Sequence, residues 1–412
     1  MFSRRAFLAS TALGTAYARG APVTAPGRLS SLTSDVAGIP GTEYQQRLAR
    51  LQSLLQQSQV AALLVEAGSS LEYFTGIQWW RSERTSAAVI PALGDTVVVT
   101  PYFESPSVSE SLKITADVRT WKEDASPFEL IAAAVRERAK DNPRVAVEST
   151  TRYFIVEGVR QAANSRFDLL SGEPYVRACR MKKSAAELAL MQAANNVTMA
   201  AIRHAHAHVS AGMRSDDVLD LIVTATTQLG GAHEFTLVLL NEASAFPHGS
   251  RKPQVVRDGS VILVDTGCAV HGYQSDISRT WFHGAPSARQ RELWNTVRRG
   301  QDIALQTAKP GVAAGEVDRA VRAYYEQHGW SKDYLLPGLS HRTGHGIGMD
   351  VHEPPYLVRN DLTPLEPGMC FSDEPGLYVP GEFGVRLEDC WYLTATGPQL
   401  FTTLAQSPEH PI

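Results

Sequence analysis

Two pairs of acidic residues are spaced so that the members of each pair can meet across a β-hairpin. Asp265 and Asp276 are 11 residues apart, and the middle of the segment between them, next to a glycine, suits a turn. Glu374 and Glu388 have their midpoint at Gly381, inside a stretch rich in turn-forming residues. Because antiparallel strands place such residues side by side, each hairpin is expected to offer two neighbouring carboxylates.

Carboxylates gathered on a core surface repel one another and lose hydration, which destabilises the fold. Divalent cations remove this cost because they neutralise the cluster. Four carboxylates with one imidazole suit two hard-to-borderline ions, with Mn favoured and Co or Zn as alternatives. The competing interpretation is that each acid is an exposed hairpin residue. The apolar run Val-Ile-Leu-Val before Asp265 disfavours that interpretation for this residue.

Histidines are concentrated in a glycine-rich segment of the C-terminal half. His341, His345 and His352 fall within twelve residues that also contain three glycines. Glycine is unfavourable in helix interiors, so we expect a loop or a bent strand that approaches another group closely. A fourth histidine, His248, follows a proline and, taken alone, is more simply explained as structural.

A second histidine cluster has a simpler explanation than metal binding. His204, His206 and His208 alternate along a predicted helix, and His204 and His208 share one face of it. No carboxylate accompanies them, so we expect a helix surface or the wall of a pocket.

Two domains are expected to position these groups. From residue 42 to about residue 171, helical and strand-like patterns alternate, which predicts an α/β domain. Its expected helices cover residues 43–57, 127–139 and 153–162, and its expected strands cover residues 60–65, 87–90, 97–100 and 145–147.

The second domain begins with a capping box formed by Ser184 and Glu187, which places a boundary near residues 172–184. Its order of two helices followed by an acidic hairpin occurs twice, so we expect two related halves. The expected helices cover residues 184–209, 215–229, 287–308 and 315–328, and the expected strand pairs join residues 261–264 with 278–282 and 370–374 with 384–393.

Composition indicates a globular protein of two or three domains. The 412 residues include 39 Lys+Arg and 43 Asp+Glu, a net charge of −4 that argues against a nucleic-acid partner. The four cysteines are far apart in the sequence and lack metal-type pairing, so free and mostly buried thiols are expected.

The first residues have the pattern of an export signal. Ser3-Arg4-Arg5 precedes an apolar stretch of about eleven residues, too short for a membrane span of roughly 20. A small-x-small sequence, Ala16-Tyr17-Ala18, then supplies a cleavage site. We expect a twin-arginine-type signal over residues 1–18, a linker over 19–41 and an exported, periplasmic protein without a stable membrane anchor. A competing interpretation is a frayed terminus with two chance arginines.

These residues together resemble the pita-bread metallopeptidases, which include Xaa-Pro dipeptidase (prolidase), aminopeptidase P and methionine aminopeptidase. The resemblance covers about residues 180–405 as the catalytic domain and residues 42–172 as a creatinase/prolidase-like N-terminal domain. It implies an α/β (α+β) fold in which an α/β domain precedes a pseudo-symmetric pita-bread domain.

The resemblance also implies roles for individual residues. The metal ligands would be Asp265, Asp276, His345, Glu374 and Glu388, holding two divalent ions that Asp276 and Glu388 bridge. Glu374 would also transfer a proton, and His352 would stabilise the developing oxyanion. The remaining catalytic residues, His248, His341 and Arg386, would position the substrate.

In the N-terminal domain of this family, aromatic residues and arginines can reach a catalytic cleft. Trp79 and Trp80 are therefore candidates for limiting substrate length, although core packing is the simpler interpretation. Arg81 and Arg84 are candidates for holding a substrate carboxylate.

The implied activity is hydrolysis of the bond before proline in a peptide substrate. A dipeptidase is favoured because the chain is compact, and an Xaa-Pro aminopeptidase acting on longer peptides is the alternative. Another metal-dependent amide hydrolase or lyase, or a non-catalytic peptide-binding protein, remains open on the same fold. The family is commonly dimeric, which implies a homodimer.

Overall fold

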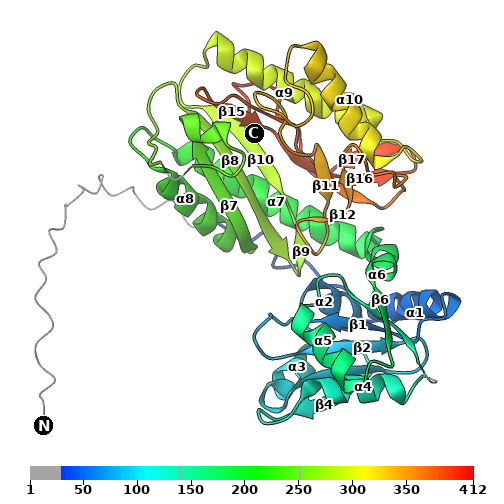
Figure 1. Ribbon diagram of the computed structural model, residues 1–412. Helices are drawn as coiled ribbons and strands as arrows, with labels where there is room; N and C mark the ends of the chain where they lie inside the picture. The colour runs from blue at the N-terminus through cyan, green and yellow to red at the C-terminus, as the bar shows by residue number, and fades with distance from the viewer. Residues whose placement is uncertain (1–28, 140–141, 251) are drawn as a thin grey trace, which may run out of the picture.

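The computed structural model describes residues 29–139, 142–250 and 252–412, and Figure 1 shows their arrangement. The predicted signal over residues 1–18 lies outside the described residues. Residues 29–40 run along the C-terminal domain, where the Leu32 amide donates to the Leu229 carbonyl over 2.9 Å and the Leu29 amide to the Gln228 side chain over 3.0 Å.

The N-terminal domain is built on one six-stranded mixed sheet with the strand order β4-β3-β2-β1-β5-β6. Its central strand β1 is antiparallel to β2 and parallel to β5, and β1, β2 and β3 are buried along their whole length. The strands are β1 (Ala62–Glu66), β2 (Ala87–Pro91), β3 (Thr96–Pro101), β4 (Ala116–Trp121), β5 (Arg144–Val147) and β6 (Asp168–Ser171). The helices are α1 (Gly41–Gln57), α2 (Ser69–Thr75), α3 (Ser105–Ser111), α4 (Pro127–Arg136) and α5 (Tyr153–Ala162).

The predicted helices and strands of this domain are confirmed, apart from shifts at their ends. Strands β4 and β6 lie at the two edges of the sheet and were not predicted. Both are incompletely buried, so neither has the continuous apolar run that marks the central strands. Helix α6 (Glu173–Arg180) follows β6 and leads into the second domain.

The first half of the C-terminal domain packs two helices on a short antiparallel sheet. Helices α7 (Ala185–His208) and α8 (Ser215–Gln228) precede β7 (Ala232–Leu240), β8 (Val261–Val270), β9 (Tyr273–Gln274) and β10 (Ile277–Phe282), with the strand order β10-β8-β7. The predicted capping box is confirmed, because the Ser184 hydroxyl accepts from the Glu187 amide and the Glu187 carboxylate accepts from the Ser184 amide.

The first acidic hairpin turns at His271 and Gly272, both of which have positive φ, as a two-residue hairpin loop requires. Asp265 on β8 therefore lies opposite Ser278, and Asp276 lies between β9 and β10. The predicted pairing of residues 261–264 with 278–282 is confirmed.

The second half repeats the plan with helices α9 (Ala288–Thr307) and α10 (Ala314–Gln327). Its main sheet has the order β12-β11-β13-β16-β17, and a separate ladder joins β14 to β15. These strands are β11 (Gly344–Gly346), β12 (Glu353–Leu357), β13 (Cys370–Asp373), β14 (Gly376–Tyr378), β15 (Gly384–Arg386), β16 (Asp389–Thr394) and β17 (Gly397–Leu400). Strand β11 is short and has a bulge between His345 and Gly346, which confirms the predicted bent segment.

The second acidic hairpin is divided into two ladders at its acids. Gly376 pairs with Arg386 and Asp373 with Asp389, so one register, centred on Gly381, runs through both ladders. The predicted pairing of residues 370–374 with 384–393 is thus correct in register but is not one continuous ladder. The Glu374 amide donates to the Thr343 carbonyl over 2.9 Å, and the Glu388 amide to the Ser278 carbonyl over 3.0 Å.

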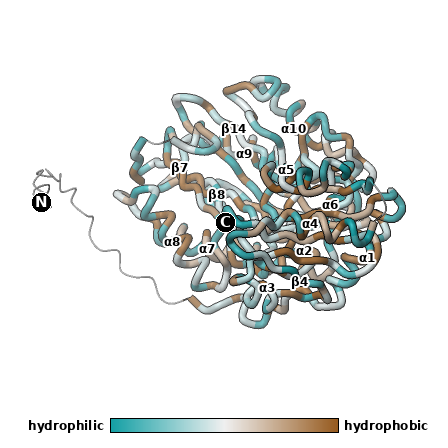
Figure 2. Tube along the Cα trace, turned by 60° about the horizontal axis from the view of Figure 1, so that its bottom comes forward, coloured by the Kyte–Doolittle hydropathy of each residue, from teal (hydrophilic) through white to brown (hydrophobic). Residues whose placement is uncertain are grey.

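The second of these hydrogen bonds, from Glu388 to Ser278, joins the two halves of the domain beside the acids. Figure 1 shows the strands lying between the green pair α7 and α8 and the yellow pair α9 and α10. Brown, hydrophobic segments follow the elements that form the cores, including α2 and α4 (Figure 2). The four cysteines are free and buried, as expected, and no helix among the described residues is long and apolar enough to cross a membrane.

Arg279 on β10 fixes the junction between the halves. Its guanidinium donates to the Glu388 carbonyl over 2.7 Å and to the Asp389 carboxylate over 2.6 Å, and both side chains are fully buried. Replacing Arg279 by Met leaves a buried carboxylate without its cation, so we predict a loss of about 3–5 kcal/mol in the free energy of unfolding. Denaturant unfolding measures this loss.

The matched control is Arg299→Met, because Arg299 lies on α9 with a side chain that is 49% exposed and 3.9 Å from Asp302. This control should change the free energy of unfolding by less than about 1 kcal/mol. An Arg279→Met protein as stable as the control would contradict a structural role for the junction.

Candidate active site

A cavity of about 710 Å³ opens where the two halves of the C-terminal domain meet. All nine candidate residues line it, although they are far apart in the sequence. They are His248, Asp265, Asp276, His341, His345, His352, Glu374, Arg386 and Glu388. Phe235, Leu237, Phe246 and Val351 add an apolar wall. The structure therefore brings the two predicted hairpins and the histidine segment to one place.

The carboxylates and His345 form overlapping groups that could each hold an ion. Possible ligand atoms of Asp265, Asp276 and Glu388 lie within 4.8 Å of one another, and so do those of His345, Glu374 and Glu388. Glu388 belongs to both groups. A third group with the same spacing joins Asp276, His345 and His352. Two neighbouring ions that share ligands fit this arrangement.

Unpaired atoms in this cluster point to cations. The Oδ1 atom of Asp265 and the Oε1 atom of Glu388 are buried and have no hydrogen-bond partner among the described residues. Nε2 of His345 lies 3.4 Å from an Asp276 oxygen and 3.3 Å from a Glu374 oxygen, while its Nδ1 lies 3.0 Å from the Gly346 carbonyl. That carbonyl favours the tautomer protonated at Nδ1, which directs the Nε2 lone pair at the acids. The residues present thus fit divalent metal ions.

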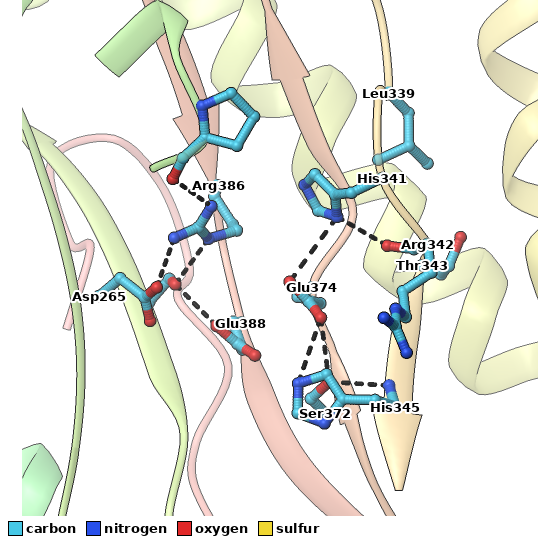
Figure 3. Close-up of polar contacts among 12 residues, drawn as sticks. Asp265, Leu339, His341, Arg342, Thr343, His345, Ser372, Glu374, Arg386 and Glu388 are labelled. Atoms are coloured by element: carbon cyan, nitrogen blue, oxygen red, sulfur yellow. Dashed lines mark hydrogen bonds and ion pairs between the residues drawn. The ribbon is translucent and has the colours of Figure 1, made fainter. Parts of the chain in front are cut away.

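Arg386 orients one of these acids. Its guanidinium donates to the Asp265 carboxylate over 2.5 Å, to the Ser278 hydroxyl over 2.9 Å and to the Tyr378 hydroxyl over 3.0 Å. Ser278 in turn donates to Glu388 over 2.7 Å. Figure 3 shows Arg386 between Asp265 and Glu388 on one side of the site, with Glu374, His341 and His345 on the other. One oxygen of Asp265 is thereby held while the other stays without a partner.

Burial and mutual repulsion keep protons on the acids. Burial, with Asp265 nearby, raises the pKa of Asp276 well above its usual value, and burial, with Asp276 nearby, does the same for the pKa of Glu388. Burial also raises the pKa of Glu374 to about 7, although His345 and Arg386 oppose that shift. Without cations, the cluster therefore binds protons in their place.

The other two histidines of the segment are neutral near pH 7. Burial, reinforced by Arg386, lowers the pKa of His341 to about 3, and burial, reinforced by His345, lowers the pKa of His352 to about 4. His341 lies 2.7 Å from the Tyr378 hydroxyl, and the His352 ring lies 4.1 Å from the His345 ring. His248 is exposed in the loop after Phe246 at the cavity wall.

Tyr378 and Ser278 are site residues that the sequence analysis missed. Tyr378 links His341 to Arg386, and Ser278 links Arg386 to Glu388. No sequence pattern marks them, because Asp276 and Glu374 lie in breaks between strands, where side-chain alternation does not relate them to Ser278 and Tyr378.

The remaining clusters lie elsewhere. His206 and His208 are exposed on α7, which confirms the helix-surface interpretation. The expectation of core packing is wrong for Trp80, which is 70% exposed and stacks on Trp79. Both tryptophans lie in a loop after α2, where Trp79 is partly buried and packs against the core, as expected, while Trp80 is exposed.

Arg81 and Arg84 are not among the residues that line the cavity. Arg81 donates to the Ala67 carbonyl over 2.9 Å, and Arg84 donates to Glu123 over 2.9 Å, both within the N-terminal domain. Within one chain, these arginines therefore bind their own domain.

The raised pKa values make a prediction about the metal-free protein. A folded carboxyl with a raised pKa binds a proton that the unfolded chain releases, so stability falls as pH rises through this range. For Glu374 this range lies between its usual pKa of 4.5 and about 7. We predict that the melting temperature of the metal-free protein falls between pH 5 and pH 8.

The Glu374→Gln variant serves as the matched comparison, because its amide cannot titrate. Its melting temperature should depend less steeply on pH over the same range. Equal slopes for the two proteins would contradict the placement of Glu374 in the cluster.

Two comparisons of sequence identify the chain's relatives. Residues 189–395 match metallopeptidase family M24, and residues 47–182 match the creatinase/prolidase N-terminal domain. The Xaa-Pro dipeptidase of Lactobacillus helveticus is 32% identical, over 86% of this chain and 96% of that protein. An uncharacterized peptidase of Schizosaccharomyces pombe is 30% identical, over 92% of this chain and 86% of that protein.

Solved structures agree with these relatives. The dipeptidase PepE of Mycobacterium ulcerans superposes with a TM-score of 0.82 at 30% identity, over 89% of this chain and 97% of that one. The X-Pro aminopeptidase of Thermotoga maritima superposes with a TM-score of 0.77 at 26% identity, over 87% and 98%. The expected pita-bread domain with a creatinase-type N-terminal domain is confirmed, and the chain belongs to metallopeptidase family M24.

Proposed function

We propose that this protein is an Xaa-Pro dipeptidase that depends on two divalent metal ions. The observation that carries the proposal is the convergence of four carboxylates and His345 on one cavity, beside three further histidines. The name of the Lactobacillus helveticus relative, Xaa-Pro dipeptidase, supports the choice of substrate.

The proposed ligands are Asp265, Asp276, His345, Glu374 and Glu388, with Asp276 and Glu388 shared between the two ions. The oxygen-rich ligand set favours Mn, and Co or Zn can be held by the same atoms. When bound, the ions supply an activated water at neutral pH and polarise the scissile carbonyl.

Glu374 is the proposed proton carrier. Its carboxylate faces His345 on one side and His341 on the other, 3.3 Å and 3.7 Å away. A carboxyl held in this position takes the proton from the attacking water and delivers it to the leaving nitrogen of proline.

The histidines are proposed to contact the substrate, whereas Arg386 is proposed to orient a metal ligand. His352 is neutral, so it can donate one N–H to the carbonyl oxygen as negative charge develops there. His248 and His341 lie on the cavity wall, where they can contact the peptide. Arg386 acts on the substrate through the acid that it orients, because Asp265, Ser278 and Tyr378 occupy its guanidinium.

A dipeptidase is preferred to an aminopeptidase acting on longer peptides. Several relatives with substantial coverage carry dipeptidase or prolidase names, including two lactobacillus Xaa-Pro dipeptidases and the prolidase of Thermococcus sibiricus. Because the X-Pro aminopeptidase of Thermotoga maritima has a similar structure, aminopeptidase activity on longer peptides is the alternative.

We also propose that the protein acts in the periplasm as a homodimer. The paired arginines Arg4 and Arg5 and the small-x-small sequence ending at Ala18 support export. Mass spectrometry of the periplasmic protein tests this proposal, and a chain that still begins at Met1 in the cytoplasmic fraction would contradict it. Sedimentation velocity distinguishes a dimer from a monomer.

Substrate length separates the two peptidase activities. We predict that protein reloaded with Mn²⁺ hydrolyses an Xaa-Pro dipeptide at least about tenfold faster than an Xaa-Pro-Xaa tripeptide and that metal-depleted protein hydrolyses neither. Cleavage is measured by release of free proline, or of the first amino acid from the tripeptide. Cleavage of only the tripeptide would favour the aminopeptidase, and cleavage of neither would contradict the proline specificity.

Loss of a shared ligand should remove the metal pair. We predict that Asp276→Asn binds fewer than two ions per chain. Its activity should fall by more than the roughly 10–100-fold that is typical when a residue hydrogen-bonded to a metal ligand is replaced. Metal content is measured by plasma mass spectrometry. Asp220→Asn, on the exposed surface of α8, is the matched control. Full metal content with near-full activity in Asp276→Asn would reject the ligand assignment.

A further inference from the structure

Charged residues at the domain boundary surround the segment that carries His352. Arg180 at the end of α6 donates to the Asp350 carboxylate over 2.8 Å and to the Glu353 carboxylate over 2.8 Å. Lys183 also donates to Glu353. Arg180, Lys183 and Glu353 are buried, so the two ion pairs that Glu353 accepts are shielded from solvent. Asp350 and Glu353, which lie on either side of His352 in the sequence, are therefore both held by ion pairs.

The same contacts reach into the N-terminal domain. The Ser69 hydroxyl, in the first turn of α2, donates to the second Asp350 oxygen over 2.5 Å. Arg180 donates to the neighbouring Ser70 hydroxyl over 3.0 Å. Asp350 thus connects α2 of one domain with the histidine segment of the other.

The backbone of the segment is held as well. The Gln274 amide on β9 donates to the Gly348 carbonyl over 2.8 Å. A Cβ atom at Gly348 would lie 2.7 Å from a Glu353 carboxylate oxygen and 2.8 Å from the Lys183 Cε atom, so any other residue would displace these two paired side chains. The segment therefore has little room to move.

The His352 ring itself lacks such support. In the part of the chain that the structure describes, no side-chain hydrogen bond holds this ring, which forms an edge-to-face pair with His345 at a centroid distance of 4.1 Å. It lines the 710 Å³ cavity and also a second cavity of about 360 Å³ between the domains. Arg180, Asp350 and Glu353 line the second cavity as well. Its position accordingly depends on the anchors at its two flanks.

We propose that Arg180 and Asp350 are positioning residues, which tie the segment of His352 to α2 so that the N-terminal domain sets the place of this ring in the active site. The catalytic consequence rests on the proposed function, because it requires that His352 contact the scissile carbonyl. Misplacement of such a group by about 1 Å can cost a reaction roughly 100-fold.

The first test is a double-mutant cycle on the metal-loaded enzyme. Asp350→Ala is suited to it because the Asp350 side chain is 44% exposed and Arg180 keeps Glu353 as a partner. We expect kcat to fall about 10–100-fold, with KM within about twofold and full metal content. In a His352→Ala background the same change should alter kcat by less than about twofold. Equal losses of kcat in both backgrounds would overturn the proposal.

Glu173→Ala is the matched control. Glu173 lines the same interdomain cavity and accepts a hydrogen bond from the Ser149 hydroxyl over 2.7 Å. This contact resembles that of Asp350 with Ser69, but neither Glu173 nor Ser149 is close to His352 in the sequence. Its kcat should stay within about twofold of the wild type. A loss as large as that of Asp350→Ala would overturn the proposal, because any change in this cavity would then suffice.

The second test does not use activity. In histidine-labelled protein loaded with diamagnetic Zn²⁺, the ring signal of His352 is identified by its absence from His352→Ala. We expect this NMR signal to shift or broaden in Asp350→Ala and in Ser69→Ala but not in Glu173→Ala. An unchanged signal in both variants would overturn the proposal. A wild-type enzyme that cleaves no Xaa-Pro peptide would instead contradict the proposed function, and the NMR result would still decide this inference.

Discussion

Repulsion among four carboxylates that meet in one cavity is the constraint on which the rest of this structure depends. One cavity is lined by all four acids, Asp265, Asp276, Glu374 and Glu388. Arg386, which lines the same cavity, donates a hydrogen bond to Asp265. The raised pKa values of the other three measure the cost of this arrangement in the absence of cations. Cations relieve it, so the same groups that destabilise the metal-free fold create affinity for metal. A net charge of −4 over the whole chain conceals this local concentration of acid.

The architecture provides the acids with a fixed frame. Each hairpin leaves its regular pairing at or beside an acid, and the freed amides of Glu374 and Glu388 bond to neighbouring strands instead. Arg279 then joins β10 to β16 behind the site. The ligands therefore lie at the junction of two half-domains, each of which has its own pair of covering helices. The N-terminal domain contacts the histidine segment near this junction. Ser69 and Arg180 both donate hydrogen bonds to Asp350, and Arg180 also donates to Ser70.

Turn chemistry and helical periodicity explain why much of this arrangement was predictable. The midpoint between Glu374 and Glu388 correctly predicted a turn centred on Gly381, and both ladders of this hairpin have the register that this turn implies. In the first hairpin the turn at His271 and Gly272 puts Asp265 opposite Ser278, a shift that the spacing of the acids did not reveal. Ser278 and Tyr378 were missed because a hydroxyl becomes a site group only through its neighbours in space. Trp80 was misplaced because an aromatic pair in a loop has no periodicity to mark its exposed side.

The central claim is that this acidic cluster is a two-metal site, and anomalous diffraction from Mn-loaded crystals tests it most directly. The account predicts two anomalous peaks in the cavity of each chain. Asp265 should lie beside one peak and His345 and Glu374 beside the other, with Asp276 and Glu388 near both. An empty cavity in Mn-loaded protein that is active, or Mn bound only away from these residues, would contradict the account.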